Sequence, residues 1–181
     1  LPEFIANQIA AGEVVQRPES VVKELVENSL DAKATTIAVT IKQAGKSLIH
    51  VIDNGMGMNK DDMLLSIRRH ATSKITSQDD LHNISTLGFR GEALASITSV
   101  ARLELRTRRQ IDDLGWVLYS EPNVAPSIEP IQTDVGTQVI VKNLFYNVPA
   151  RKKFLRSDIT EFRHISDSMI KFTNNYEPVI W

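Results

Sequence analysis

The chain has no cysteine among its 181 residues, so it can form neither a disulfide nor a thiolate metal site. Its four histidines are scattered and show no metal-ligand spacing, which argues against a zinc site. No apolar run approaches the roughly 20 residues that cross a bilayer. The first residues, LPEFIANQIA, lack the basic start and long apolar stretch of a signal peptide. These absences predict a soluble, cytoplasmic protein without membrane contact.

An excess of one charge is also absent. The chain has 21 basic and 22 acidic side chains and a formal net charge of −1. This balance argues against a surface built as a whole to hold nucleic acid or anionic lipid, so any DNA contact must come from a local patch. Two basic clusters could follow phosphates, although solvated charge on an exposed face is the more ordinary interpretation. The clusters are Arg102, Arg106, Arg108 and Arg109, and Arg151, Lys152, Lys153 and Arg156.

The composition that is present suits one folded domain. The chain is 42% hydrophobic and 24% charged, which is enough apolar material for a core at this length. It does not begin with Met, and it stops at Trp181 just after Val179 and Ile180, which resemble the start of a strand. We therefore expect residues 1–181 to form one domain and to be a piece of a longer protein.

Hydrophobic periodicity predicts a mixed order of helices and strands. Helices are expected over residues 3–11, ended by Gly12, and over 18–32, 61–70, 92–100, 151–156 and 158–175. A hairpin is expected over 35–53, and further strands over 102–108, 115–120 and 136–144. Residues 71–89 are polar with little periodicity, which predicts a long mobile loop of the kind that often carries function.

The helix expected over residues 18–32 carries two polar residues of interest. Its apolar stripe consists of Val21, Val22, Leu25, Val26 and Leu30. Glu24 and Asn28 follow one turn apart on another side, where both could simply face solvent. Asn is a poor helix former because its side chain competes with the backbone. An Asn in mid-helix, one turn after a Glu, therefore indicates a possible ligand.

The stretch DNGMGM, which begins at Asp53, comes directly after the second strand of the hairpin. Asp53 offers an acceptor at a strand end, while Gly55 and Gly57 allow positive φ and close approach of a ligand to the backbone. A plain turn would explain Asn54 and Gly55, but it needs neither the second glycine nor the flanking methionines. A calcium loop is excluded, because its third and fifth positions would be glycines without side-chain oxygens.

The stretch GFRGEAL, residues 88–94, has the features of an anion site. Two glycines and Arg90 precede a predicted helix whose free N–H groups would favour phosphate. A glycine-rich turn with a surface arginine is an equal interpretation of this stretch alone. Lys74 and Thr137 add a cation and a hydroxyl. No G-x-x-x-x-G-K-[ST] run occurs, which excludes a P-loop.

In this order and spacing, these pieces resemble the nucleotide-site motifs of the GHKL ATPase superfamily. The strings ANQIAAGEVVQRPESVVKELVENSLDA, DNGMGM, RRHATSKI, LGFRGEALASI and LFYNVPARKKFLR are similar to the MutL family of DNA mismatch repair proteins, across essentially all of the chain. The resemblance implies an α/β two-layer sandwich, in which a mixed, mostly antiparallel sheet carries helices on one face. It also implies that residues 1–181 are the nucleotide-binding subdomain, without the second subdomain that supplies a phosphate-contacting lysine.

The resemblance further implies a site for ATP and Mg²⁺. Glu24 would be the general base, Asn28 the Mg²⁺ ligand, and Asp53 the acceptor for the adenine 6-amino group, with Thr137 supporting that contact. The other implied nucleotide contacts are Gly55, Gly57, Met58, Thr72, Ser73, Lys74, Leu87, Gly88, Phe89, Arg90 and Gly91. Of these, Thr72, Ser73 and Lys74 and the turn over residues 88–91 would form a lid over the phosphates.

The implied function is ATP binding and slow, Mg²⁺-dependent hydrolysis in a mismatch repair clamp. Lid closure and ATP-dependent dimerisation would coordinate MutS and a downstream nuclease or helicase, with weak, non-specific DNA contact at the nucleoid. One alternative is a nucleotide-gated switch without significant hydrolysis, which would not need a carboxylate at position 24. Another is a different GHKL member, such as a type II topoisomerase ATPase domain. A histidine kinase would need a phosphoacceptor helical hairpin, which the sequence lacks.

Overall fold

The computed structural model describes residues 1–69, 92–176 and 179–180. The helices are α1 (Glu3–Val14), α2 (Pro18–Asp31), α3 (Lys60–Ser66), α4 (Ala93–Thr98), α5 (Pro149–Phe154) and α6 (Asp158–Asn175), with a short 3₁₀ turn, η1 (Gln43–Gly45). The strands are β1 (Ile37–Lys42), β2 (Leu48–Asp53), β3 (Arg102–Arg108), β4 (Gly115–Glu121), β5 (Val124–Ile131), β6 (Gly136–Lys142) and β7 (Val179–Ile180).

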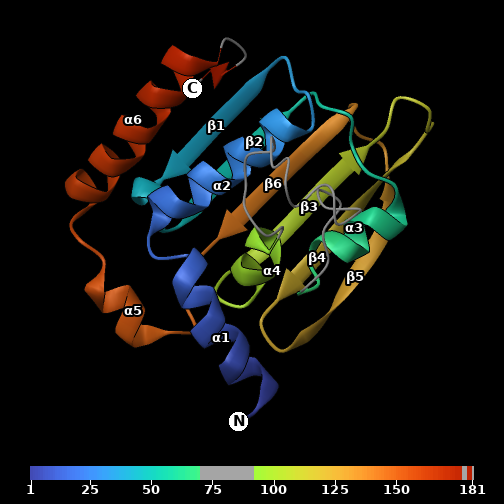
Figure 1. Ribbon diagram of the computed structural model, residues 1–181. Coiled ribbons are helices and arrows are strands. Elements are labelled where there is room, and N and C mark those ends of the chain that lie inside the picture. Colours follow the sequence, from blue (N-terminus) through green and yellow to red (C-terminus); the bar gives the residue numbers. More distant parts are fainter. Residues whose placement is uncertain (70–91, 177–178, 181) are drawn as a thin grey trace, which may run out of the picture.

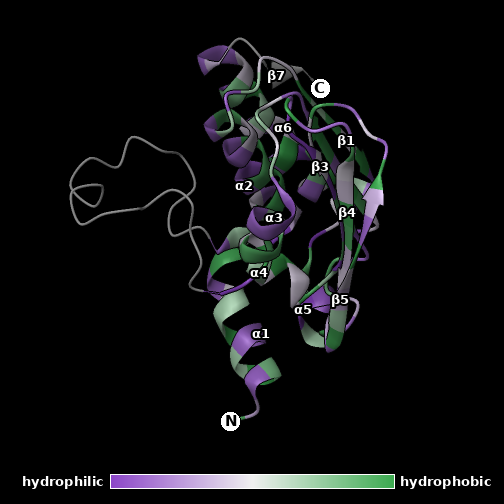
Figure 2. Ribbon diagram, turned by 90° about the vertical axis from the view of Figure 1, so that its right-hand side faces the viewer, coloured by the Kyte–Doolittle hydropathy of each residue, from purple (hydrophilic) through white to green (hydrophobic). Residues whose placement is uncertain are grey.

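The strands form one seven-stranded sheet in the order β5-β4-β3-β6-β2-β1-β7. Every neighbouring pair is antiparallel except β1 and β7, which are parallel. Seen edge-on, helices α1, α2, α3, α4 and α6 lie on the same side of this sheet (Figure 2). The expected fold class, a mixed and mostly antiparallel sheet with helices on one face, is confirmed.

Helix α2 lies over β2, beside α6, near the middle of the sheet (Figure 1). It starts at Pro18, whose fixed φ and missing N–H suit the first helical position. The predicted apolar stripe faces the sheet, and its buried members are Val21, Val22, Leu25 and Val26. Burial of each such side chain stabilises the fold by about 1.5–3 kcal/mol. The stripe therefore fixes which side of α2 faces the sheet.

Three polar residues share one row at one end of the three central strands of the sheet, β3, β6 and β2. Asp53 of β2 is opposite Thr137 of β6, and Thr137 is opposite Thr107 of β3. Opposed residues of antiparallel strands point to the same face, and residues two positions away share that face. Those neighbours are core residues, namely Val51, Val139 and Leu105. Asp53, Thr137 and Thr107, here called the polar row, thus stand where the apolar core would otherwise continue.

Two expected elements differ from the structure. Helix α1 does not end at Gly12 but continues to Val14, with a glycine in its interior. Strand β5 was not predicted, because Pro126 and Pro130 interrupt its sequence VAPSIEPI. It lies at the edge of the sheet, where proline is tolerated because an edge strand does not use all of its N–H groups.

The remaining differences concern element ends. Helix α3 covers residues 60–66 and α4 covers 93–98, both shorter than expected. The expected loop, residues 71–89, lies outside the described residues. None of the helices in the described ranges is long and apolar enough to cross a membrane.

Candidate functional site

Asp53 ends strand β2 with its carboxylate buried and held by three donors. The Ser29 hydroxyl donates to Oδ2 at 2.7 Å. The backbone N–H groups of Gly55 and Thr137 donate to Oδ1 at 2.8 and 3.2 Å. Ser29 comes from α2, so this carboxylate joins the helix layer to the sheet. Two carboxylate oxygens offer about four lone-pair positions, so capacity remains for one further donor.

Burial raises the pKa of the Asp53 carboxyl above its ordinary value, while the hydrogen bonds from Ser29, Gly55 and Thr137 act in the opposite direction. The folded protein therefore binds this proton more readily than the unfolded chain does. The stability that Asp53 contributes is present below the ordinary pKa of 3.8 and is lost as pH rises through the folded-state pKa.

We expect the free energy of unfolding of the wild-type protein, relative to Asp53→Asn, to fall as pH rises above 3.8. The amide cannot ionise, so it removes this titration while keeping the shape of the side chain. Urea denaturation of both proteins, from below that pH to neutrality, measures the difference. A difference that grew with pH would contradict the raised pKa.

The loop after β2 is tied to both layers by its own backbone and by Asn54. The Asn54 side-chain oxygen accepts from the N–H groups of Thr35 and Thr36 at 2.8 and 2.9 Å. The N–H of Met56 donates to the carbonyl of Ala32, at the end of α2, at 2.9 Å. The loop DNGMGM is therefore fixed by contacts that a free surface turn would lack.

The two glycines of this loop are required for different reasons. Gly57 has φ of +68°, and an added Cβ would lie 2.1 Å from the carbonyl oxygen of Arg108. Gly55 is not in the left-handed region, but an added Cβ would lie 2.7 Å from the carbonyl oxygen of Ala32. The expected positive φ is thus confirmed at Gly57 alone, and close packing explains Gly55.

Gly57→Ala is expected to lower the free energy of unfolding by about 1–3 kcal/mol, because the residue must keep a positive φ and meets backbone atoms of β3. Gly12→Ala is the matched control, since Gly12 is inside a helix and the nearest atom to its added Cβ is 3.9 Å away. That change should raise stability by about 0.5–1 kcal/mol. Urea denaturation measures the free energy of unfolding of both variants. Equal effects of the two substitutions would contradict a specific requirement for glycine at position 57.

Thr107 is fully buried and contacts both the loop and β6. The N–H of Met58 donates to its hydroxyl oxygen at 2.9 Å. The same hydroxyl lies 3.2 Å from the carbonyl oxygen of Gly136 and 3.0 Å from the Thr137 hydroxyl. The loop, β3 and β6 therefore meet at this one oxygen.

Sequence reasoning missed both Ser29 and Thr107. Each could have been noticed in the sequence, because each is a polar residue at a position where the periodicity of its helix or strand predicts a core-facing side chain. Ser29 is buried on α2 beside the apolar stripe, one turn after Leu25. Thr107 follows the buried Leu103 and Leu105 in the alternation of β3.

Glu24 and Asn28 lie one turn apart on α2, and both are partly buried. Asn28 directly precedes Ser29, the partner of Asp53, along α2. Among the described residues no group of three or more His, Cys, Asp or Glu could hold a metal ion. One amide oxygen fits a Mg²⁺ ion that takes its other ligands from phosphate and water.

The other predicted contacts divide into two groups. Asp53, Gly55, Gly57, Met58 and Thr137 are brought together at the ends of β2 and β6 and in the loop between them and α3. The remaining residues lie outside the described part of the chain: Thr72, Ser73, Lys74, Leu87, Gly88, Phe89, Arg90 and Gly91.

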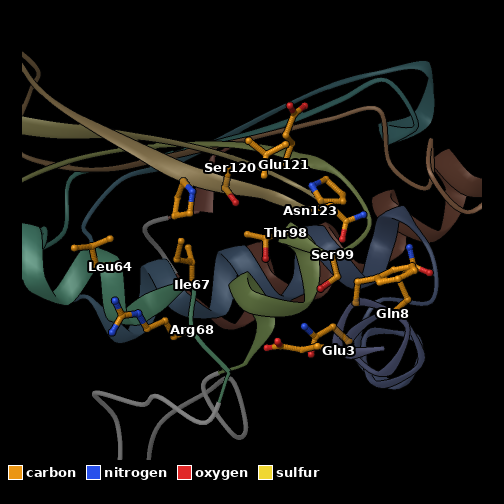
Figure 3. A pocket seen from close by; sticks show the side chains of 15 residues that line it. Glu3, Gln8, Leu64, Ile67, Arg68, Thr98, Ser99, Ser120, Glu121 and Asn123 are labelled. Carbon is orange, nitrogen blue, oxygen red and sulfur yellow. The ribbon is translucent and has the colours of Figure 1, made fainter. Parts of the chain in front are cut away.

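A pocket of about 440 Å³ lies elsewhere, between α1, α3, α4 and the turn from β4 to β5 (Figure 3). Ile67 and Arg68 border it on one side, Glu3 and Gln8 on another, and Asn123 lies at the turn. None of the predicted nucleotide contacts that the structure describes lines it. It is therefore separate from the polar row.

The arginines of the first basic cluster form ion pairs and hydrogen bonds with other groups of the protein. Arg102 pairs with Glu121 at 3.2 Å, Arg106 with Glu104 at 2.6 Å, and Arg109 with Asp112 at 2.8 Å. Arg108 donates to the carbonyl oxygens of Thr133 and Asp112. These contacts favour the ordinary interpretation of this cluster over phosphate binding.

Arg151 of the second cluster also makes contacts within the protein. Its guanidinium lies over the Phe145 ring, 4.3 Å from the centroid, and donates to the carbonyl of Val15. Burial lowers the pKa of Arg151. It ties α5 to the connection between α1 and α2, while Lys152, Lys153 and Arg156 are exposed.

Residues 16–120 match the model of the family described as histidine kinase-, DNA gyrase B-, and HSP90-like ATPase. The chain is 55% identical over 181 residues to the DNA mismatch repair protein MutL of Chlorobaculum tepidum, and 57% identical over 167 residues to that of Christiangramia forsetii. It covers 29% and 27% of the lengths of these relatives.

Solved structures give the same result. The Aquifex aeolicus MutL ATPase domain complexed with ADP is 34% identical, with a TM-score of 0.70, over 92% of this chain and 58% of that one. The same domain with a K252N mutation has a TM-score of 0.72 at 32% identity, over 92% of this chain and 56% of that one. The chain belongs to the histidine kinase-, DNA gyrase B- and HSP90-like ATPases, and within them it is similar along its whole length to MutL proteins and over 92% of its length to a MutL ATPase domain.

Proposed function

We propose that this chain binds ATP and hydrolyses it slowly, as the nucleotide-binding subdomain of a DNA mismatch repair protein. The polar row carries the proposal, because it places a buried carboxylate on a face that is otherwise apolar. Asp53 is held by three donors and keeps acceptor capacity for one more. Such an acceptor suits the 6-amino group of adenine and opposes the 6-oxo group of guanine, which has no hydrogen to donate.

Hydrolysis is assigned to two residues of α2. Glu24 would take the proton of the attacking water, and Asn28 would hold the Mg²⁺ that reduces the negative charge on the phosphates. Their spacing of one helical turn supports the pairing, since it places base and metal ligand at neighbouring points of one helix face. Phosphate contacts are assigned to residues 72–74 and 87–91, which would close over the nucleotide.

The role of the longer protein is proposed from its relatives, of which this chain spans less than a third. ATP-dependent closure and dimerisation would coordinate MutS with a downstream nuclease or helicase. DNA contact would be weak and non-specific, and the exposed Lys152, Lys153 and Arg156 of the second basic cluster are candidates for it.

Calorimetric titration with ATP and with GTP, each in the presence of Mg²⁺, tests the nucleotide assignment. ATP should bind measurably. GTP should bind roughly tenfold or more weakly, since a buried acceptor left without its donor costs about 1–3 kcal/mol. Equal affinity for the two nucleotides would contradict the role of Asp53, and binding of neither would contradict the proposed function.

A further inference from the structure

Within the polar row, the hydroxyl of Thr107 has three polar neighbours and a single proton. It accepts from the N–H of Met58 at 2.9 Å. The carbonyl of Gly136, at 3.2 Å, can only accept, so that contact requires the Thr107 proton. The third neighbour, the Thr137 hydroxyl at 3.0 Å, can donate or accept.

Because Thr107 has only one proton for these three contacts, the direction of the hydrogen bond between Thr107 and Thr137 is determined as well. All three contacts are satisfied together only if Thr107 donates to Gly136 and Thr137 donates to Thr107. The oxygen of Thr137 then has its proton committed inside the protein and offers only lone pairs to a ligand. Thr107 is fully buried, so water does not supply an alternative partner there.

We propose that Thr107 is a positioning residue that sets purine selectivity by fixing Thr137 as an acceptor. The proposal rests on the proposed ATP site and adds a residue that does not contact the nucleotide. With Thr107 in place, Asp53 and Thr137 present two acceptors side by side, which suits a 6-amino group. Without the Thr107 hydroxyl, Thr137 is free to turn and donate, and a 6-oxo group is then tolerated.

The test compares ATP with inosine triphosphate, which carries a 6-oxo group in place of the 6-amino group. Thr107→Val keeps the shape of the side chain and removes the hydroxyl. We expect it to lower the ratio of ATP to inosine triphosphate affinity roughly tenfold, measured by calorimetry. A purely structural defect would weaken both nucleotides and leave their ratio unchanged.

Two controls match this change. Thr107→Ser retains the hydroxyl and should keep the ratio within about twofold of wild type. Thr40→Val makes the same substitution at an exposed position of β1 and should change neither affinity. If the valine variant does not fold, Thr107→Cys gives the same measurement, because its thiol is a weak donor and acceptor and should also lower the ratio.

Each outcome separates this inference from the function on which it depends. A wild-type ratio in a folded Thr107→Val or Thr107→Cys variant overturns the role of Thr107 alone. Loss of selectivity in Thr107→Ser also overturns the role of Thr107, because the hydroxyl is present in that variant without its proposed effect. A wild-type protein that binds no ATP overturns the proposed function itself.

Discussion

Asp53→Asn is expected to abolish measurable ATP binding and to leave the domain folded. The amide can keep the internal contacts, since its oxygen accepts from the N–H groups of Gly55 and Thr137 and its NH₂ donates to Ser29. It then presents N–H toward the adenine 6-amino group, where an acceptor is needed. Two opposed donors in a buried site, together with a lost charge-assisted bond, should weaken binding about 100-fold or more.

Calorimetry of Asp53→Asn with ATP and Mg²⁺ measures this effect, and circular dichroism checks the fold. Asp167→Asn is the matched control, because Asp167 is exposed on α6 and has no assigned role. The control should bind ATP as the wild-type protein does. Normal ATP affinity in Asp53→Asn would end the assignment of Asp53 as the adenine acceptor.

Glu24→Ala is expected to reduce ATP hydrolysis by about 10² to 10⁴ while keeping ATP affinity within a few fold. A general base acts on the attacking water and not on the nucleotide, so its removal slows the reaction without weakening binding. Asn28→Ala should do the reverse and weaken the binding of Mg²⁺-ATP. Turnover at saturating ATP and calorimetric affinity, measured on the full-length protein, separate the two roles.

Glu27→Ala is the control for this pair, because Glu27 is on the same helix and has no assigned role in the site. It should retain both hydrolysis and binding. If Glu24→Ala still hydrolysed ATP at the wild-type rate, the protein would be a nucleotide-gated switch whose hydrolysis does not depend on this carboxylate.

Elements with clear periodicity were predictable from the sequence. Helix α2 and the β1–β2 hairpin follow their apolar spacing closely. Strand β5 was not predictable, because Pro126 and Pro130 argue against a strand unless its edge position is known. Helix α1 shows the same limit, since packing carries it through a glycine that local propensity treats as an end.

In the candidate site, the motif DNGMGM predicted Asp53 and Gly57 as site residues. The structure explains both from their surroundings, because the Asp53 carboxylate accepts three hydrogen bonds and Gly57 has a positive φ. Ser29 and Thr107 were missed because their importance depends on which strands and helices are neighbours. The sequence of β3 alone cannot say that Thr107 stands opposite Thr137. Such a register follows from the packing of the whole sheet.

Strand β5 is the outermost strand on one side of the sheet. It contains two residues that lack an N–H group, Pro126 and Pro130. On an edge strand, alternate N–H groups point away from the sheet and are the donors that a strand of another molecule would need. Proline is accommodated at these outward positions. Copies of this domain are therefore hindered from joining edge to edge across β5, which removes one route into cross-β fibrils when the protein is concentrated.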